Sequence, residues 1–346
     1  MSKILTIGVA AYNAESTISN TIESLLVPEI MDKVEILIIN DGSTDGTRKI
    51  IEKYKERYPK TVRVINKSNG GHGSVINKTI SLAKGKYMKM VDADDTLEEI
   101  GYVDLVNILQ SETVDAVLSP YFTANIISKE KSLHGYLLND EKIFYDKRKV
   151  KFNDYYKKIK PTLHSITYRT AILRDSKWRV DEKCFYEDTQ YSLYYWLDIN
   201  SILLLSKPIY CYWLGNENQS VNIKNRLVRR QQAISVVLNL VNFFDSEKAN
   251  MSMQKITFFK SEIDGYTTFI YKLLMALSDE KKAKKETKIY DTYLKQNSIV
   301  LYSGLGNYGT SKKLARLIKI LRKTSWHGYY IVYKLLNKKI IKQITV

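Results

Sequence analysis

The sequence predicts an α/β protein in which helices flank a mostly parallel sheet, followed by a helical C-terminal region. Continuous apolar runs alternate with segments of helical periodicity through the first hundred residues. Runs of this kind indicate strands that are buried on both faces, as they are in parallel sheets covered by helices. Long helical patterns dominate after residue 225. We therefore expect an α/β domain over 1–225 and a mainly helical region over 226–346.

Four predicted strands in the N-terminal part are separated by predicted helices. The strands are 3–12 (KILTIGVAAY), 34–40 (VEILIIN), 62–66 (VRVIN) and 86–92 (KYMKMVD). Apolar residues at helical spacing after the first strand predict a helix with Ser16 as its N-cap. A second helix should end near Tyr58, and a third should cover 73–85, with Gly85 as its stop signal. The later strand-like segments are 114–122 and 201–214, and 185–197 has the pattern of a loop that enters a helix.

Polar residues follow each of these four strands. The strand ends carry Tyr12–Asn13, Asp41–Gly42, Asn69–Gly71 and Asp92–Asp94. In open parallel sheets, ligands bind beyond the carboxyl ends of the strands, near the point where the strand order reverses. The sequence therefore predicts that these residues meet at one edge of the sheet and form its binding site.

Composition limits the cellular setting. The chain has 346 residues, a net charge of +17 and two cysteines, Cys184 and Cys211, outside any Cys-x-x-Cys pair. So few thiols indicate a reducing compartment without a disulfide framework. The first apolar run is too short for a signal peptide, and no stretch reaches the roughly 18 apolar residues of a membrane span. We expect a cytoplasmic protein, soluble or peripheral on the inner face of the plasma membrane.

The clustered acids of MVDADD, residues 90–95, suit a divalent cation. Asp92 and Asp94 follow a buried strand, where like charges repel and resist desolvation unless a donor or cation is present. Mg²⁺ and Mn²⁺ take one or two carboxylates and complete their shell with water and substrate phosphates. The alternative is a helix N-terminus at which Asp94 and Asp95 interact favourably with the helix dipole.

Three quoted segments together resemble the inverting glycosyltransferases of family 2, which have the GT-A fold. VAAYNAE is similar to the first strand and loop of that family, and LIINDGSTDGT is similar to the second. NGGHGSVINKTISLAKGKYMKMVDADD is similar to its third loop, helix and metal-binding strand. The resemblance is strong over 1–120, the expected nucleotide-sugar part, and weaker over 121–225, the expected acceptor part.

The resemblance implies a role for each matched residue at the donor. Tyr12 would stack on a uracil base, and Asp41 would hydrogen-bond that base or its ribose. Asp92 would lie by the ribose and the metal, and Asp94 would be the chief ligand of Mn²⁺ or Mg²⁺. The other donor-site residues that it implies are Ala10, Asn13, Asn69, Gly71, His72, Asn77 and Ala93.

Two departures from the family pattern stand out. Ala10 occupies a position where many members have Pro, and Ile76 occupies one where many have Arg. One expected positive contact is therefore absent. His72 is a candidate to replace part of it, and a loop histidine without a role is the alternative.

A sugar transfer with inversion also needs a base to accept the proton of the attacking hydroxyl. FYEDTQY resembles the Glu-Asp motif of the family, which makes Asp188 the predicted base with Glu187 in support. The alternative is a pair of acids that satisfy a helix dipole. Gln219 and Ser220, in a segment that resembles a diphosphate-closing loop without its usual Arg, are weaker candidates. His164 is equally compatible with a structural and a functional role.

The end of the chain is basic. Eleven of the 54 Lys and Arg residues follow Asp291, after which there is no acid. Residues 312–342 contain a basic amphipathic pattern, typical of helices that lie on anionic membranes, with Trp326, Tyr329 and Tyr330 suited to the interface. A solvated helix packed on the catalytic lobe is the alternative.

These observations predict a metal-dependent inverting glycosyltransferase that moves a sugar from a UDP-sugar to a hydroxyl of a glycan acceptor on lipid or protein. One alternative is a nucleotidyltransferase of similar fold. Another is a non-catalytic basic protein that binds nucleic acid, whose charge would allow it. We expect no nucleic-acid partner, because the positive charges lie in the tail, away from an acidic loop cluster that would repel phosphate backbones unless a metal intervened. The sugar, the linkage and the oligomeric state, with a homo-oligomer among the options, stay open.

Overall fold

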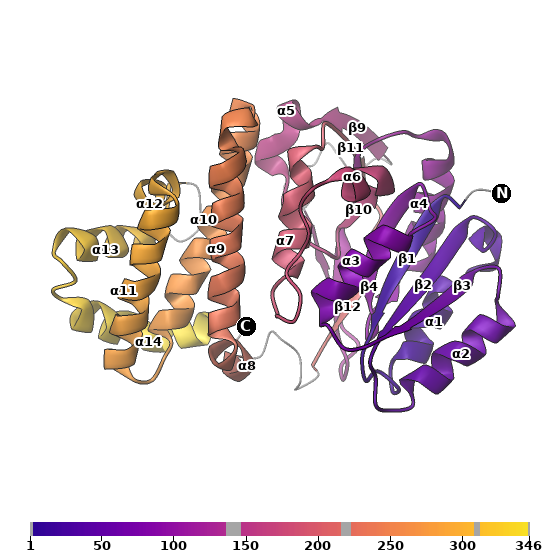
Figure 1. The fold of residues 1–346 in the computed structure, drawn as a ribbon, viewed down its shortest axis with the longest axis horizontal. Helices are drawn as coiled ribbons and strands as arrows, with labels where there is room; N and C mark the ends of the chain where they lie inside the picture. The colour runs from indigo at the N-terminus through magenta and orange to yellow at the C-terminus, as the bar shows by residue number, and fades with distance from the viewer. Residues whose placement is uncertain (1–2, 136–146, 216–222, 308–311, 345–346) are drawn as a thin grey trace. The chain divides into compact units, whose positions relative to one another are not determined.

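A computed structural model describes residues 3–135, 147–215, 223–307 and 312–344. The chain divides into two compact units, Met1–Gly215 and Asn216–Val346. The division falls shortly before the boundary expected at 225. Figure 1 shows strands and helices together in the first unit and helices throughout the second.

The N-terminal unit is built on an eight-stranded sheet in the order β3-β2-β1-β4-β10-β6-β11-β9. Its strands are β1 Leu5–Ala11, β2 Val34–Asp41, β3 Val62–Lys67, β4 Tyr87–Asp92, β6 Ala116–Leu118, β9 Lys147–Lys151, β10 Ile166–Arg169 and β11 Ser201–Leu205. The first four strands are parallel to one another. β10 is antiparallel to both of its neighbours, and β9 is antiparallel to β11. The prediction of a mostly parallel sheet in an α/β fold is confirmed.

The apolar strands are buried as their composition predicts. Every residue of β2 is buried, as is nearly all of β1 and β4. The helices of this unit are α1 Ile18–Leu25, η1 Pro28–Ile30, α2 Thr47–Arg57, α3 His72–Leu82, α4 Glu99–Ser111, α5 Phe152–Tyr155, η3 Tyr156–Lys158, α6 Thr170–Asp175, α7 Asp188–Leu193 and η4 Tyr194–Leu197. The predicted N-cap Ser16 is wrong: α1 begins at Ile18, and its N-cap residue Thr17 makes no side-chain cap bond.

A second, four-stranded sheet has the order β5-β12-β7-β8. Its strands are β5 Thr96–Leu97, β7 Tyr121–Asn125, β8 Lys131–His134 and β12 Tyr210–Leu214. Each of the segments predicted as 114–122 and 201–214 divides between the two sheets. Pro120 and Pro208 lie at the two divisions, where a residue without an N–H cannot continue a strand ladder. This switch carries Tyr121 and Tyr210 toward the end of β4.

The C-terminal unit is helical. Its elements are α8 Ile223–Val228, α9 Arg230–Glu247, η5 Lys248–Asn250, α10 Met253–Met275, α11 Glu280–Asn297, α12 Ile299–Gly304, α13 Lys312–Lys323 and α14 Tyr329–Ile344. Ser252, Asp279 and Ser298 cap α10, α11 and α12 by accepting a hydrogen bond from the backbone three residues on. Among the described residues, no helix is long and apolar enough to cross a membrane.

The amphipathic pattern at 312–323 does form a helix, α13, but its apolar face is used inside this unit. The residues Leu314, Ala315, Ile318 and Leu321 are buried. Trp326 and Tyr329, expected at a membrane interface, are buried too, whereas Tyr330 is 48% exposed. Only the basic face of α13 is therefore open to a partner.

Candidate active site

The strand register brings the first and fourth loops together. Ala10 of β1 pairs with Asp92 of β4 on one side and Ile39 of β2 on the other. The residues that follow these strands therefore share the carboxyl edge of the sheet, as predicted. Beyond β1, Tyr12 is 53% exposed, and its ring is accessible for stacking.

Asn13 ties the first loop to the second. It adopts a left-handed conformation with φ of 47°, which Asn tolerates better than most residues. Its Oδ1 accepts a hydrogen bond of 2.8 Å from the backbone N–H of Thr44, and its own N–H donates to Ser43 Oγ at 3.1 Å. The structure therefore gives Asn13 a loop-positioning role, and its predicted contact with the donor stays a prediction.

Asp41 is buried at the end of β2 and organises the third loop. Its Oδ1 accepts from the N–H of Gly70 at 2.9 Å, and its Oδ2 accepts from the N–H of Gly71 at 2.8 Å. Lys67, which sequence reasoning missed, forms an ion pair with the same carboxylate. Gly71 has φ of +80°, a conformation that suits glycine. The predicted role of Asp41 at the base or ribose thus stands beside an observed role in shaping the loop.

Helix α3 joins the third loop to the segment before α7. Asn77 Nδ2 donates to the carbonyl of Val180 and to Glu182 Oε1, both at 3.0 Å. A Cβ on Gly73 would come within 1.9 Å of the Asp181 carbonyl oxygen. Helix α3 and residues 180–182 are therefore in direct contact, and the side chain of Asn77 holds them together. Asn69 lies exposed in the loop.

His72 bridges the two acidic motifs of the site. Its Nε2 lies 3.0 Å from Asp92 Oδ1, and its Nδ1 lies 2.8 Å from Glu187 Oε1. Burial disfavours the charged imidazole, but the two carboxylates outweigh burial and raise the pKa of His72 well above its usual value. His72, the first residue of α3, therefore supplies a positive charge close to the position at which Ile76 replaces the expected Arg.

Asp188 opens α7 beside this bridge. Asp188 is an exposed residue. Partial desolvation by the neighbouring protein, followed by the charge of Glu187, raises the pKa of Asp188 to about 6. The positive charge of His72 acts in the opposite direction. A carboxylate of this kind is ionised near neutral pH and is a stronger base than an ordinary aspartate.

Asp95, the last of the three neighbouring acids of MVDADD, is held inside the protein by hydrogen bonds. It is fully buried, and its two oxygens accept from Tyr210 Oη at 2.6 Å and from the Trp213 N–H at 2.8 Å. Desolvation, with the charges of Asp92 and Asp94, raises the pKa of Asp95 well above its usual value. This carboxyl group anchors the turn after β4 to β12, a role that the sequence did not reveal.

The same turn offers candidate metal ligands. Among the described residues, Asp92, Asp95 and His164 present ligand atoms within 4.8 Å of one another. Asp94, the expected chief ligand, is half-buried in the same turn but outside this group. Ala93, between Asp92 and Asp94, is buried, and its carbonyl accepts a hydrogen bond from Thr21 Oγ1 at 2.9 Å. Carboxylate oxygens at one turn fit a hard divalent cation such as Mg²⁺ or Mn²⁺.

His164 is held in a cluster of rings near these acids. Its ring stacks on Tyr212 at 4.6 Å between centroids and lies 5.2 Å from Tyr121. Burial lowers the pKa of His164 to about 4, so it is neutral near pH 7. Lys89, buried in β4, donates to the His164 carbonyl at 2.7 Å. The sequence signal for Lys89 was a lysine inside the apolar stretch YMKMV, and burial lowers the pKa of Lys89 to about 7.

Not every predicted residue can be placed. Gln219 and Ser220 lie outside the described residues. Ala10 is a strand residue whose part is its pairing with Asp92. Of the other predicted residues, Asp92 and Glu187 contact His72, whereas Asn13, Asp41 and Asn77 hold the surrounding loops. The residues that sequence reasoning missed, among them Lys67, Lys89 and Tyr210, all act by holding a loop or an acid in place.

Solved structures share this architecture. The crystal structure of S. aureus TarS 1-349 in complex with UDP-GlcNAc is 18% identical, with a TM-score of 0.51 over 87% of this chain and 91% of that chain. A mannosyltransferase from Pyrobaculum calidifontis, in complex with GDP-Man and Mn²⁺, is 13% identical, with a TM-score of 0.50 over 99% of this chain and 86% of that one. The fold is therefore of the GT-A class.

Sequence comparison assigns the family. The model of glycosyl transferase family 2 matches residues 6–177. An uncharacterized glycosyltransferase of Mycoplasma pneumoniae is 40% identical over 95 residues, 27% of this chain and 31% of that protein. The chondroitin synthase of Pasteurella multocida is 37% identical over 123 residues, 35% of this chain and 12% of that protein. The chain belongs to glycosyltransferase family 2, and these alignments span less than a third of each relative's length.

Proposed function

We propose that this protein transfers a sugar from a UDP-sugar to a hydroxyl group of a glycan acceptor, with inversion at the anomeric carbon. One observation carries the proposal: the His72 ring contacts both Asp92 and Glu187, at 3.0 and 2.8 Å. The contact joins the acids expected at the donor to those expected at the acceptor. A nucleotidyltransferase has no evident need for Glu187 and Asp188, the two acids expected at the acceptor.

In this mechanism, the loops after β1, β2 and β3 bind the nucleotide. The exposed ring of Tyr12 stacks on the base, and the Gly70–Gly71 backbone, held by Asp41, approaches the donor closely. The oxygen of the acceptor hydroxyl attacks the anomeric carbon of the donor sugar, and the bond between that carbon and UDP breaks. Asp188 accepts the proton that the hydroxyl loses. Glu187 keeps His72 oriented, and His72 restrains the pKa of Asp188.

Asp92 and Asp94 would hold a divalent cation, as their oxygen chemistry suits it. Such a cation, when bound, neutralises negative charge on the diphosphate leaving group. The donor nucleotide is proposed as UDP because TarS was crystallised with UDP-GlcNAc. The GDP-Man complex of the Pyrobaculum mannosyltransferase makes GDP the comparison to include in any test.

Calorimetric titration with UDP, in Mn²⁺ and then in chelator, tests the donor site. We expect binding that requires the metal, and loss of that binding in Asp94→Asn with the fold unchanged. Asp175→Asn, at an exposed aspartate of the same unit, is the matched control. Equal affinity of Asp94→Asn and the wild type would remove Asp94 from the metal site. Binding of GDP in preference to UDP would reassign the donor.

We place the acceptor at an anionic membrane surface, which the open face of α13 contacts. Lys312, Lys313, Arg316 and Lys323 are exposed along this face, and Ile320 among them is 55% exposed. A stripe of cations complements anionic lipid head groups. Each Lys or Arg near the surface contributes about 1 kcal/mol to the free energy of binding. The buried apolar face excludes insertion of that face, so binding should be electrostatic and weaken with salt.

Flotation with vesicles of phosphatidylcholine, with and without phosphatidylglycerol, tests this contact. We expect binding only to the anionic vesicles, and a marked loss in the triple variant Lys312→Gln, Lys313→Gln, Arg316→Gln. Anionic binding that is unchanged in this variant would move the contact to another surface of the chain.

A further inference from the structure

The edge strand β9 and the helical turns after it form a cationic surface in the N-terminal unit. Residues 147–160 (KRKVKFNDYYKKIK) hold seven Lys or Arg residues and one acid, Asp154. A groove of about 600 Å³ runs along this segment. Five cations line it: Arg148, Lys149, Lys151, Lys157 and Lys158. We call it the β9 groove.

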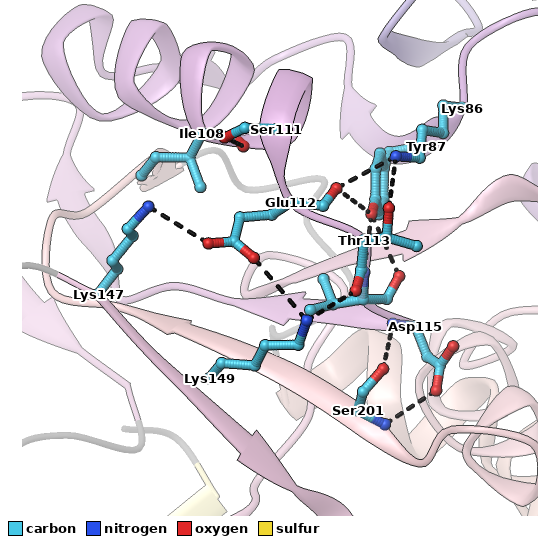
Figure 2. Close-up of polar contacts among 11 residues, drawn as sticks. Lys86, Tyr87, Ile108, Ser111, Glu112, Thr113, Asp115, Lys147, Lys149 and Ser201 are labelled. Atoms are coloured by element: carbon cyan, nitrogen blue, oxygen red, sulfur yellow. Dashed lines mark hydrogen bonds and ion pairs between the residues drawn. The ribbon is translucent and has the colours of Figure 1, made fainter.

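Part of this charge has no carboxylate partner among the described residues. Lys147 and Lys149 share one carboxylate, Glu112, at 3.4 and 3.9 Å, as Figure 2 shows. Lys149 also donates to the Thr113 carbonyl at 3.1 Å. In the parts of the chain that the structure describes, no carboxylate pairs with Arg148, Lys151 or Lys157. The groove therefore keeps several cations available for a ligand.

Aromatic rings position some of these cations. The Arg148 guanidinium lies 6.0 Å from the ring centre of Tyr155, and Lys158 Nζ lies 5.3 Å from the same ring. Lys157 Nζ lies 5.8 Å from the ring of Tyr156. Tyr155 is buried, so it gives these long side chains a fixed support. Such support reduces the conformational entropy that binding would otherwise remove.

The β9 groove is separate from the candidate active site. Lys151, at the end of β9, pairs with Ser201, the first residue of β11. β11 is parallel to β6, and β6 and β4 are both antiparallel to β10, so β11 runs in the direction of β4. The groove therefore extends toward the sheet edge opposite the one where β4 ends in Asp92.

We propose that the β9 groove binds a polyanionic chain, in which phosphate or carboxylate groups recur along a flexible polymer. The concave shape favours a chain over a flat bilayer, and the unpaired cations match repeated negative charge. Lysines on an edge strand also prevent pairing with another sheet, but that role does not extend to Lys157 beyond the strand. The identification of this polymer as the glycan acceptor rests on the proposed function.

The test uses fluorescently labelled inorganic polyphosphate and the full chain. The groove variant is Arg148→Gln, Lys151→Gln, Lys157→Gln. The control is Lys49→Gln, Lys53→Gln, Lys60→Gln, which removes three exposed cations of the same unit outside the groove. We expect the groove variant to bind at least about tenfold more weakly near 0.1 M salt, with a salt slope smaller by about 2 for three lost contacts. The control variant should stay within about twofold of the wild type.

Three outcomes would overturn the proposal. Equal weakening of both variants would assign the affinity to net charge alone. Unchanged affinity of the groove variant would leave β9 with its edge-protecting role. Loss of phosphatidylglycerol vesicle binding in the groove variant, with polyphosphate affinity kept, would make the surface a membrane contact. UDP titration of the same samples separates this test from the proposed function, because absent UDP binding would sink only the latter.

Discussion

A buried ion pair in the C-terminal unit and the candidate active site in the N-terminal unit balance charge in opposite ways. In the C-terminal unit, Arg322 and Asp291 are both buried and form an ion pair at 2.7 Å. Arg322 also donates to the Tyr302 carbonyl and to Tyr271 Oη, and its guanidinium lies 3.6 Å from the centre of the Tyr302 ring. Every polar group of this arrangement has an opposite or complementary partner.

The candidate active site instead gathers like charges. Asp92, Asp95, Glu187 and Asp188 collect at one edge, with His72 as the positive group between Asp92 and Glu187. Desolvation, together with neighbouring negative charge, raises the pKa of Asp188 to about 6 and raises the pKa of Asp95 well above its usual value. A surplus of negative charge costs stability, so a chain retains it where a ligand or a reaction needs it.

The sharpest test of this contrast is Asp188→Asn. We expect the turnover number to fall about 10²–10⁴-fold, because the amide cannot accept the proton of the acceptor. UDP affinity should be unchanged, which calorimetry would show. Asp175→Asn is the control, and retained turnover in Asp188→Asn would assign the base elsewhere.

In the C-terminal unit, Arg322→Met should act on stability. Removal of one partner leaves Asp291 buried without its counter-charge, at a cost of about 3–5 kcal/mol. Chemical denaturation of the full chain measures this loss, with the exposed Arg316→Met as the control on the same helix. If both variants unfolded at the same denaturant concentration, the Arg322–Asp291 pair would not stabilise the unit.

Tyr210→Phe asks whether Asp95 belongs with the structural charges. The hydroxyl donates to a buried carboxyl group, so its loss should destabilise the protein by about 1.5–3 kcal/mol. Tyr54→Phe, which removes an exposed hydrogen bond to Glu23, is the control and should cost less. A stable Tyr210→Phe protein with weakened metal-dependent UDP binding would instead make Asp95 part of the donor site.

The pH dependence of turnover reports the pKa of the proposed base, Asp188. Asp188 must be unprotonated to act as a base, so kcat/KM should fall about tenfold per pH unit below about 6. His72→Gln removes a charge that lowers the pKa of Asp188, and the acid limb should move to higher pH. His327→Gln, at an exposed position, should leave it in place. A limb that does not move in His72→Gln would separate His72 from the base.

Sequence reasoning predicted the strands and loops that carry the site. The apolar runs around β1, β2 and β4 are buried on both faces, so their composition alone indicates a parallel sheet. Their polar ends had to meet at one edge. Sequence reasoning could not show that Asp95 faces inward. The hydrogen-bond donors to its carboxyl group come from β12, more than a hundred residues away in the chain.

The amphipathic pattern of α13 teaches the same lesson. Periodicity alone predicted the helix, because a repeat near 3.6 residues is a local property. Whether its apolar face meets lipid or protein depends on which other helices are present, and the C-terminal unit buries that face. The basic run 147–160 is visible in the sequence, but its groove forms only when the strand and the turns after it fold together.

The sequence by itself determined the α/β class, the order of the motifs and the family, since these depend on local periodicity and on residue types at fixed spacing. Tertiary structure alone decided which acid is paired, which is crowded and which is open. A carboxylate's charge state depends on solvent and on partners within a few ångströms. Those partners, such as His72 for Glu187 and Tyr210 for Asp95, lie more than a hundred residues apart in the chain.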